Sequence, residues 1–241
     1  MLSAYMPAAA NPLLKYPRPS VAVDVVALTV TEGGLRVAVY KRTEPPSKGS
    51  WALPGGFVRI DESLDDAAAR LLAQKAGFEG VFLEQLYTFG DVRRDPRGRV
   101  IAVAYYALVD ARRFHTRRAP HAVSARVHVP WPGETGGPVD VVHEDRVLPL
   151  AFDHADIVGL AVKRLRGKID YTPVGFQLLP PEFTLRQLQE VHESVRGEEL
   201  NKDSFRRRML TSGLLEASGA RERDVLHRPA ELYRFVRRSA V

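Results

Sequence analysis

The segment from residue 51 to residue 78 constrains the fold most, because its pattern changes from a loop to a helix within a few positions. It begins Trp-Ala-Leu-Pro-Gly-Gly, and a proline followed by two glycines favours a loop. From about Asp61, apolar side chains recur at helical spacing, with Ser63 as a possible cap and Gly77 as a stop. These side chains are Leu64, Ala67, Ala68, Leu71 and Leu72. The segment therefore predicts a loop that leads into a helix over 61–77.

Runs rich in β-branched and aromatic residues lie on both sides of this helix and predict strands. The predicted strands are 21–30, 35–41, 83–90 and 99–108. Gly33-Gly34 is a turn that would make the first pair a hairpin, and Arg94-Asp95-Pro96-Arg97-Gly98 joins the second pair. Strands that frame a helix in this way indicate a mixed α/β sandwich. The proline-containing stretch 1–19 predicts an irregular tail.

The pattern breaks again between Tyr171 and Pro181, where three prolines and a glycine end any periodicity. A Pro/Gly-rich loop at 130–138 and a helix over 154–166 precede this break. We place a domain boundary at the break. The expected units are a tail at 1–19, a first domain at 20–153, a linker helix and linker at 154–181, and a second domain at 182–241.

The sequence of the second domain predicts two helices followed by a pair of strands. Apolar residues at helical spacing predict a helix over 183–195, which Gly197 ends. A polar turn leads to a second helix over about 202–210, which Gly213 ends. Strands at 214–216 and 231–235 would then flank a charged tip at 219–224. This order is typical of a winged helix-turn-helix domain that binds DNA.

The second helix of this domain is strongly basic. Its basic side chains are Lys202, Arg206, Arg207 and Arg208. Successive helical residues are about 100° apart, so the three arginines fan over roughly 200° and only one or two can read base edges. Phosphate or minor-groove contacts suit Asn201, Ser204, Arg221 and Arg223. The alternative interpretation is a basic helix face that is simply solvated.

Composition narrows the classes of function. A net charge of +6 and a pI near 9.7 suit a polyanionic partner. The absence of cysteine excludes disulfides, thiolate metal sites and cysteine nucleophiles. The sequence has neither an apolar run of the ~18 residues that span a bilayer nor the pattern of a signal peptide. We therefore expect a cytoplasmic protein with no membrane partner.

The loop and helix described first resemble the Nudix box. In that motif a glycine, five residues, a glutamate, seven residues and then Arg-Glu-apolar-x-Glu-Glu-x-Gly-apolar form a loop-helix-loop that binds magnesium. The matching positions are Gly56, Glu62, Arg70, Leu72, Gly77 and Phe78. The leading Trp-Ala-Leu-Pro-Gly-Gly also resembles the strand that enters the box. The resemblance implies a Nudix-type α/β/α sandwich for the first domain.

Three glutamates of the motif are missing, and their positions hold Leu71, Gln74 and Lys75. Magnesium bridging a pyrophosphate needs hard anionic oxygen ligands, and a lysine in that place repels the ion. We therefore expect no metal site, no catalytic residue and no efficient hydrolysis. Cations can hold a phosphoryl group without a metal, so a ligand pocket is still expected. The expected ligand contacts are Glu62, Arg70, Lys75, Arg94 and Arg97.

Over nearly the whole chain from about Ser20, the order of segments resembles the Nudix-related transcriptional regulators (NrtR). The likeness rests on the degenerate box and on the segments 150–154, 164–168, 205–208 and 228–235. Members of that family are bacterial repressors, typically of NAD-biosynthesis genes, and they bind palindromic operators as dimers. The resemblance implies a repressor of NAD-metabolism genes that acts as a homodimer on double-stranded DNA. It also implies ADP-ribose or a related phosphorylated nucleotide as effector, with no cofactor.

Three alternatives stay open. The first is an active pyrophosphatase for ADP-ribose or another nucleoside-diphosphate sugar. The second is a protein in which a carboxylate outside the box rebuilds a metal site, the candidates being Asp61, Asp65, Asp66 and Glu84. The third is a regulator of the same build that serves sugar catabolism. The turn at 94–98 also has an alternative interpretation, as an ordinary exposed hairpin tip.

Overall fold

The computed structural model describes residues 12–31, 34–116, 119, 121–223 and 228–236. Within these residues a nine-stranded sheet forms the centre of the molecule. Its strands are β1 (Ser20–Thr31), β2 (Gly34–Lys41), β3 (Trp51–Ala52), β4 (Gly55–Phe57), β5 (Phe82–Phe89), β6 (Val100–Leu108), β7 (Ala122–His128), β8 (Asp140–His143) and β9 (Arg146–Val147). They lie in the order β5-β6-β1-β2-β7-β8-β9, with β3 on β2 and β4 on β1.

β1 is the central strand of this sheet. It pairs antiparallel with β2, with Leu28 opposite Val37, and parallel with β6, with Val23 opposite Val103. Its valine-rich core is buried on both faces, as expected for a strand with neighbours on both sides and helices above and below. The predicted pairing of the first two strands and the predicted strands around 83–90 and 99–108 are confirmed, whereas Gly33 of the expected turn lies outside the described residues. Strands β7, β8 and β9 were not predicted, and β4, which pairs with β1, begins within the stretch where a loop was expected.

Helix α1 (Leu64–Ala76) covers one face of the sheet together with the short α2 (Ala111–Thr116). The side chain of Ser63 accepts a hydrogen bond from the backbone N–H of Asp66, and Gly77 has a left-handed φ of 73°. The predicted cap and stop are therefore confirmed. The helix begins at Leu64 rather than near 61, because Ser63 is its N-cap and the preceding residues form a loop.

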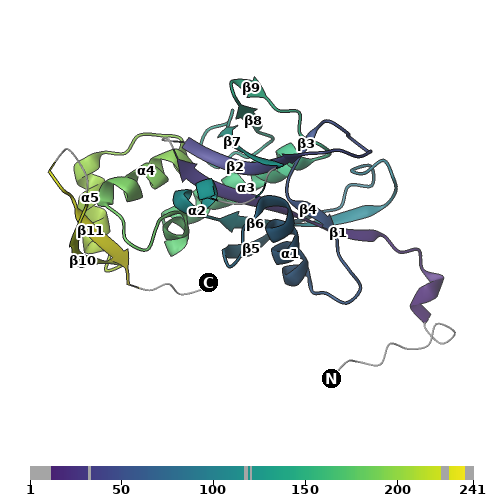
Figure 1. The fold of residues 1–241 in the computed structure, drawn as a ribbon, viewed down its shortest axis with the longest axis horizontal. Coiled ribbons are helices and arrows are strands. Elements are labelled where there is room, and N and C mark those ends of the chain that lie inside the picture. The colour runs from purple at the N-terminus through teal and green to yellow at the C-terminus, as the bar shows by residue number, and fades with distance from the viewer. Residues whose placement is uncertain (1–11, 32–33, 117–118, 120, 224–227, 237–241) are drawn as a thin grey trace.

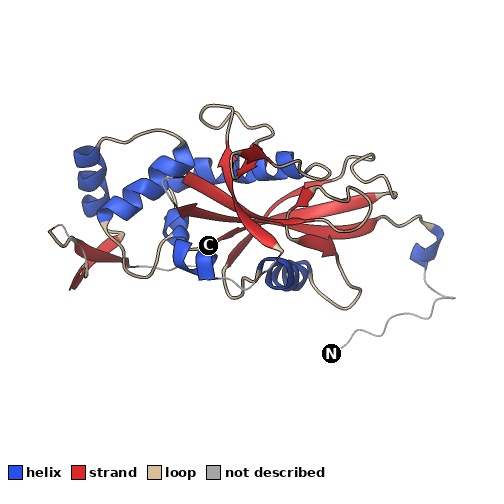
Figure 2. Cartoon of the chain, turned by 45° about the horizontal axis from the view of Figure 1, so that its top comes forward, coloured by secondary structure: helices blue, strands red, loops and turns tan. Residues whose placement is uncertain are grey.

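Helix α3 (His154–Ile169) covers the opposite face. We expected this segment to belong to a linker, but its inner side is part of the same apolar cluster as β1 and β2. Its buried residues are His154, Ile157, Val158, Gly159, Ala161, Val162, Leu165 and Ile169. The helix therefore supplies the third layer of the α/β/α sandwich, as Figure 2 shows with helices on both sides of the strands.

The break between the two domains is also more ordered than its prolines predicted. Residues Pro173–Leu178 form the 3₁₀ helix η3, capped by Thr172. The Phe176 ring in η3 stacks on Phe235 at a centroid distance of 4.2 Å. The connection is therefore packed against the C-terminal domain. Near the N-terminus, Pro12–Lys15 form a second short 3₁₀ helix, η2, and the earlier part of the expected tail lies outside the described residues.

The C-terminal domain has the predicted order of elements: α4 (Leu185–Arg196), α5 (Lys202–Thr211), β10 (Leu215–Arg221) and β11 (Glu231–Phe235). Thr184 and Gln187 form a capping box at the start of α4. Phe183, which we expected inside the helix, instead exchanges two backbone hydrogen bonds with Tyr233 of the wing. β10 extends to Arg221, so this residue lies on a wing strand, and residue 224 of the expected tip lies outside the described residues.

The C-terminal elements gather at one end of the molecule, at the left of Figure 1, where α4 contacts β1 and β2. Apolar residues of α4 and α5 join the cluster that α3 forms with the sheet. The two domains therefore share a continuous core. In the described part of the chain, none of the helices combines the length and apolar character that crossing a membrane requires.

Candidate ligand pocket and DNA-binding surface

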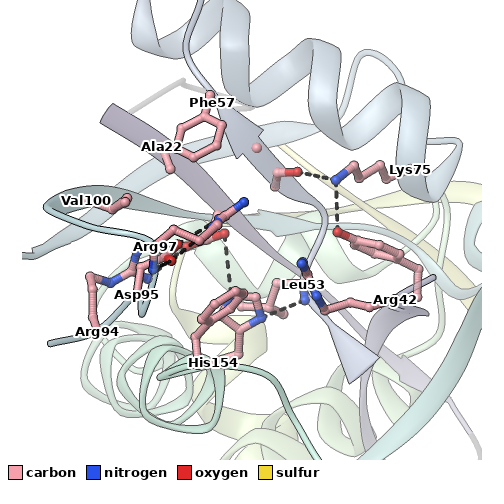
Figure 3. A pocket seen from close by; sticks show the side chains of 15 residues that line it. Ala22, Arg42, Leu53, Phe57, Lys75, Arg94, Asp95, Arg97, Val100 and His154 are labelled. Carbon is pink, nitrogen blue, oxygen red and sulfur yellow. Dashed lines mark hydrogen bonds and ion pairs between the residues drawn. The ribbon is translucent and has the colours of Figure 1, made fainter. Parts of the chain in front are cut away.

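A cavity of about 200 Å³ lies between β1, the end of α1, the start of α3 and the loops that follow β3 and β5 (Figure 3). Its charged lining has more cations than anions, since Arg42, Lys75, Arg94 and Arg97 face only the carboxylates of Asp24 and Asp95. The rest of the lining is Ala22, Tyr40, Leu53, Gly55, Gly56, Phe57, Val100, Phe152 and His154. An excess of arginine and lysine in a recess suits a phosphorylated ligand.

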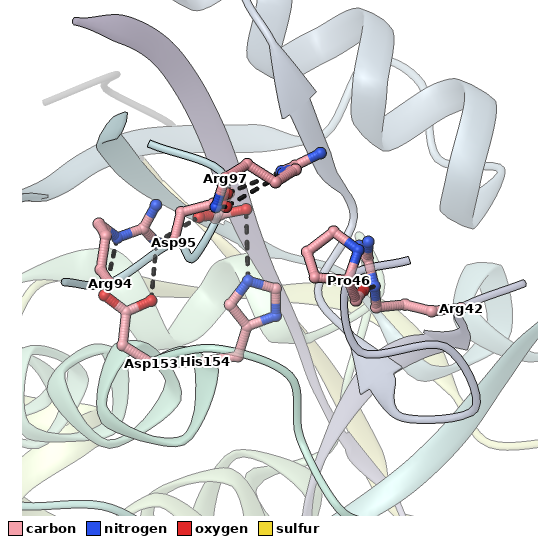
Figure 4. A network of polar contacts seen from close by, with 8 residues as sticks. Arg42, Pro46, Arg94, Asp95, Arg97, Asp153 and His154 are labelled. Carbon is pink, nitrogen blue, oxygen red and sulfur yellow. Dashed lines mark hydrogen bonds and ion pairs between the residues drawn. The ribbon is translucent and has the colours of Figure 1, made fainter. Parts of the chain in front are cut away.

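Arg94 lines the cavity and is held by two carboxylates, Asp153 and Asp24 (Figure 4). Its Nε and Nη2 lie 2.9 and 2.7 Å from the two oxygens of Asp153, and Nη2 also lies 3.3 Å from Asp24 Oδ2. The Arg94 side chain is only 5% exposed. A buried guanidinium needs such partners, because desolvation disfavours an unpaired charge. Asp153 immediately precedes α3, so this pair ties the loop at 94–98 to that helix.

His154 lies beside this network as a neutral ring. The backbone N–H of Leu53 donates to its Nδ1 at 3.0 Å, so the ring proton is on Nε2, which lies 3.6 Å from Asp24 Oδ1. Complete burial lowers the pKa of His154, although the Asp24 carboxylate acts in the opposite direction. Gly55 makes this arrangement possible, because a Cβ there would lie 2.3 Å from Asp24 Oδ1. The glycine therefore allows the loop to approach β1.

Lys75 carries its charge from the last turn of α1 to the cavity wall. Its Nζ donates to the Tyr40 hydroxyl at 2.9 Å and to the carbonyl oxygen of Gly55 at 2.5 Å, and it lies 4.6 Å from the centre of the Tyr40 ring. Lys75 occupies a position where the Nudix box has a glutamate. The ammonium group therefore lies at the cavity in place of a potential metal ligand.

The other two altered positions of the box point elsewhere. Leu71 is buried, and a Cβ on Gly56 would come 3.0 Å from its Cδ2. Gln74 accepts a weak hydrogen bond from Arg70, with Nη1 and Oε1 3.4 Å apart. Neither side chain lines the cavity.

Glu62 and Arg70, which we predicted as ligand contacts, bind each other instead of lining the cavity. Arg70 Nε lies 2.8 Å from Glu62 Oε2, and Arg70 Nη2 also donates to Glu62 Oε1. The hydrogen bond from Arg70 lowers the pKa of Glu62 to about 2. The pair connects the first turns of α1 with the preceding loop. The structure thus brings three of the five predicted ligand residues to the cavity: Lys75, Arg94 and Arg97.

The mouth of the cavity carries two arginines that lie over aromatic rings. Arg97 is held by Asp95 through contacts of 3.0 and 2.7 Å, and its guanidinium lies 5.3 Å from the centre of the Phe57 ring. Arg42 lies 5.0 Å from the centre of the Phe152 ring. The turn at 94–98 is therefore part of the cavity wall. This placement disfavours the interpretation of the turn as an ordinary hairpin tip.

Sequence reasoning missed several residues of this cavity, above all Asp24, Arg42, Phe152 and His154. Asp24 was missed because it lies within a predicted strand, where a single polar residue does not by itself indicate a site. The other three belong to segments that the fold brings together from distant parts of the chain. The one signal available was Asp24 itself, since a carboxylate in the middle of a buried strand needs a partner.

The carboxylates outside the box that could rebuild a metal site are scattered. Asp65 accepts a hydrogen bond from the Tyr105 hydroxyl at 2.6 Å, Asp66 is bonded to Ser63, and Glu84 pairs with Lys168 at 2.6 and 2.7 Å. Among the described residues, no three histidine or acidic side chains form a group that could hold a metal ion.

A second recess, a groove of about 670 Å³, lies between α4, α5 and the wing. Five cations line it, and they are Arg186, Lys202, Arg206, Arg221 and Arg228. Lys202 and Arg206 are one helical turn apart on the exposed side of α5. The predicted basic helix and the wing therefore share one cationic groove, which is the kind of surface that fits a nucleic-acid backbone.

The remaining predicted DNA contacts differ in their environments. Asn201 caps α5, since its side chain accepts from the backbone N–H of Ser204 at 3.0 Å. Arg207 is exposed and makes no side-chain hydrogen bond or ion pair within the described residues. Arg208 turns back toward the body of the protein, with Nη2 3.6 Å from Asp170 Oδ1 and the guanidinium over Phe205. Arg223 is exposed at the end of the described wing.

Family models match both halves of the chain. A model described as the NUDIX domain matches residues 18–131, and one described as the NrtR DNA-binding winged helix domain matches residues 175–235. The chain is also similar to an ADP-ribose pyrophosphatase of Methanocaldococcus jannaschii, at 34% identity over 90 residues, which are 37% of this chain and 51% of that enzyme. The two family models support the division into a Nudix domain and a winged helix.

Two relatives are similar over nearly the whole chain. The ADPR responsive transcriptional repressor NtrR of Acinetobacter baylyi is 36% identical over 222 residues, which cover 91% of this chain and 83% of that protein. The crystal structure of Shewanella oneidensis NrtR complexed with a 27mer DNA is 33% identical, with a TM-score of 0.71, and the match covers 89% of this chain and 93% of that chain. With both domains in the same order and this identity along their length, the chain belongs to the NrtR family.

Proposed function

We propose that this protein is a transcriptional repressor whose binding to operator DNA is controlled by ADP-ribose or a related phosphorylated nucleotide. The observation that carries the proposal is the pairing of a cationic cavity in the Nudix domain with a cationic groove on the winged helix. The similar protein of A. baylyi is named as an ADPR responsive repressor, and the similar Shewanella protein has a structure with DNA. ADP-ribose is a product of NAD breakdown, so genes of NAD metabolism are the proposed targets. We place the protein in the cytoplasm, where these genes are.

The diphosphate of the effector is the part that best fits the cavity. Four cations surround a space of about 200 Å³, which is smaller than typical pockets for whole drug-sized ligands. The charged centre of the effector would therefore lie inside, between Lys75 and Arg97. The exposed Phe57 ring at the mouth offers a surface for an adenine or ribose.

We also propose that the domain does not hydrolyse its ligand. Lys75 brings an ammonium group to the place where the motif needs a carboxylate, and a metal ion there would be repelled. No metal or other cofactor is then required for effector binding. With MgCl₂ and ADP-ribose, turnover near 1 per second or faster, the ordinary range for enzymes, would refute this proposal.

The decisive experiment measures operator affinity by fluorescence anisotropy with and without saturating ADP-ribose. DNA from the promoter regions of NAD-metabolism genes serves as the probe, and a scrambled duplex of equal length and charge is the control. A homodimer should protect two half-sites centred about 34–36 Å apart, one helical turn of DNA. Effector binding should change the operator affinity, since a ligand acts only by favouring one of two arrangements.

Assays on the same protein preparation distinguish the proposed function from two of the alternatives given above. A sugar-catabolism regulator would respond to a sugar phosphate or nucleotide sugar and not to ADP-ribose. An active pyrophosphatase would release AMP in the presence of magnesium, and its operator affinity would not depend on an intact effector. Absence of any specific DNA binding would remove the repressor function altogether.

A further inference from the structure

Helix α3 contacts both the cavity and the DNA-binding unit. Its first residue, His154, lines the cavity, and the residue before it, Asp153, holds Arg94. At 1.5 Å per residue, the 16 residues of α3 span about 24 Å. The residue that follows its last turn, Asp170, lies against both α4 and α5. One helix therefore links two surfaces that are distant in space.

Asp170 is the contact point with the helix-turn-helix unit. Arg196 of α4 donates to its Oδ2, and Nη2 of Arg208 in α5 lies 3.6 Å from its Oδ1. Nδ1 of the buried His192 lies 3.7 Å from the same Oδ1. These contacts place one carboxylate of the Nudix domain beside two arginines and a histidine of the DNA-binding unit. Asp170 therefore contacts side chains of both helices of the helix-turn-helix unit.

The body of α3 is suited to transmit a displacement without bending. Its inner side is buried along its whole length, as described above. Arg166 donates to the carbonyl oxygen of Val195 at 2.8 Å, which fixes the C-terminal end of α4 to the last turns of α3. Gly159 packs so closely that an added Cβ would lie 1.8 Å from the carbonyl oxygen of Gly137. Closely packed elements tend to shift as units between discrete arrangements.

At the cavity end of α3, an anionic ligand would compete with Asp153 for Arg94. Arg94 lines the cavity and at the same time forms a two-point ion pair with Asp153. Arginine binds phosphate and carboxylate through the same fork of donors. A diphosphate beside Arg94 would therefore weaken its hold on Asp153 and on the start of α3.

We propose that α3 couples effector to operator, with Arg94 released from Asp153 at one end and Asp170 repositioning Arg208 and α5 at the other. This inference rests on the proposed function and adds the route by which the effector acts on DNA binding. Asp153 and Asp170 are positioning residues in this route, because neither lines the cavity or the DNA-binding groove. Coupling requires that the ligand bind the two positions of α3 with different affinity.

The test compares Asp153→Asn and Asp170→Asn with the wild type in the full-length protein. The measured quantity is the ratio of operator Kd with and without saturating ADP-ribose, and calorimetry confirms that ADP-ribose still binds each variant. In the wild type we expect a ratio within the ~5–150-fold range common for coupled sites. Both variants should reduce the ratio severalfold toward 1. A merely structural role would change the melting temperature or the basal Kd and leave the ratio in place.

Two charge-matched controls lie close to these positions. Asp156→Asn removes an exposed carboxylate from the first turn of α3, and Glu199→Gln removes one from the turn between α4 and α5. Neither side chain makes a hydrogen bond or ion pair within the described residues, so both controls should keep the wild-type ratio. If Asp170→Asn prevents folding, Arg208→Gln removes the same contact from a side chain that is 46% exposed.

The outcomes separate this inference from the proposed function. If the wild type responds to ADP-ribose and the Asp153 and Asp170 variants keep its full ratio, the coupling route is overturned and the proposed function stands. If the wild type binds operator but its Kd does not change with ADP-ribose, the proposed function fails, and the coupling route fails with it.

Discussion

Arg70 and Glu62 hold each other in a two-point ion pair, with Arg70 Nε 2.8 Å from Glu62 Oε2. Glu62 Oε1 also accepts from the backbone N–H of Arg59 at 2.8 Å, and Arg70 reaches the carbonyl oxygen of Phe57 at 3.4 Å. Both residues match the Nudix motif, yet in this chain they brace the loop before α1. Two residues can therefore match the motif in sequence and yet bind each other instead of lining the cavity.

The first prediction concerns this pair. Arg70→Lys should lower the melting temperature, because lysine cannot make the two-point contact with Glu62. It should leave the Kd for ADP-ribose unchanged, because Arg70 does not line the cavity. Differential scanning fluorimetry and calorimetry measure the two quantities. Arg59→Lys is a control on the same loop, since only its backbone N–H contacts Glu62. Weaker ADP-ribose binding by Arg70→Lys would restore Arg70 as a ligand contact.

The second prediction concerns Lys75, whose Nζ lies at the cavity wall. Lys75→Ala should weaken ADP-ribose binding by ~10-fold or more, since hydrogen bonds to a charged group contribute roughly 1.5–3 kcal/mol. The comparison is Lys41→Ala, which removes an exposed lysine next to Tyr40 that does not line the cavity. Calorimetry on both variants checks the result. Equal affinities of the two variants would show that the ligand lies elsewhere.

The sequence predicted the elements around the cavity better than it predicted the cavity itself. α1, its cap and its stop follow from local spacing and from Ser63 and Gly77, so their positions needed no tertiary information. Lys75 was predicted because it occupies a position where the Nudix motif has a glutamate. His154 and Leu53 are 101 positions apart, and only the packing of α3 on the sheet brings them together. No local pattern records such a contact.

The missed strands have a similar explanation. β8 and β9 are four and two residues long, too short for alternation of buried and exposed residues to be recognised. α3 was assigned to a linker because it lies between two proline-containing breaks, although its own apolar spacing was visible. Burial of its inner side depends on the opposite face of the sheet, which sequence alone does not place.

The third prediction concerns pH and His192. The pKa of His192 is lowered to about 4, chiefly by burial; nearby Arg208 and Arg196 act in the same direction, while Asp170 acts in the opposite direction. The unfolded chain binds a proton near pH 6.5, and the folded protein does so only near pH 4. The stability that this neutral ring contributes is therefore present above pH 6.5 and falls as the pH drops toward 4. The expected loss is about 3 kcal/mol.

A matched variant isolates this contribution. His192→Gln keeps a neutral polar side chain and should remove this part of the pH dependence, whatever its effect on stability at neutral pH. Urea unfolding at several pH values between 4 and 7.5 gives the slopes. His128→Gln is the control, because His128 is largely exposed. Parallel curves for the wild type and His192→Gln would show that folding does not shift the pKa of His192.

The last prediction concerns the three arginines of α5. Arg206 lines the groove beside the wing and Arg207 is exposed without a partner within the described residues, whereas Arg208 faces Asp170 and Phe205. Replacement of a base-reading arginine by alanine costs ~1–3 kcal/mol and relaxes preference at one operator position, while loss of a phosphate contact weakens all sequences alike. Arg206→Ala and Arg207→Ala should therefore each weaken operator binding in one of these two ways. Arg208→Ala should instead act mainly on the response to ADP-ribose.

Binding to a set of operators with single base changes, repeated at several salt concentrations, distinguishes these cases. Loss of a phosphate contact reduces the salt dependence by about one counterion, whereas loss of a base contact changes the order of preference among operators. Arg186→Ala offers a comparison within the same groove, because Arg186 lies on α4 and pairs with Glu190 at 2.9 Å. If Arg208→Ala relaxed preference at one base position as strongly as Arg206→Ala, α5 would have to enter the DNA with the face that here contacts Asp170. The contact between α3 and α5 would then have to break on DNA binding, and operator and Asp170 would compete for the same arginine.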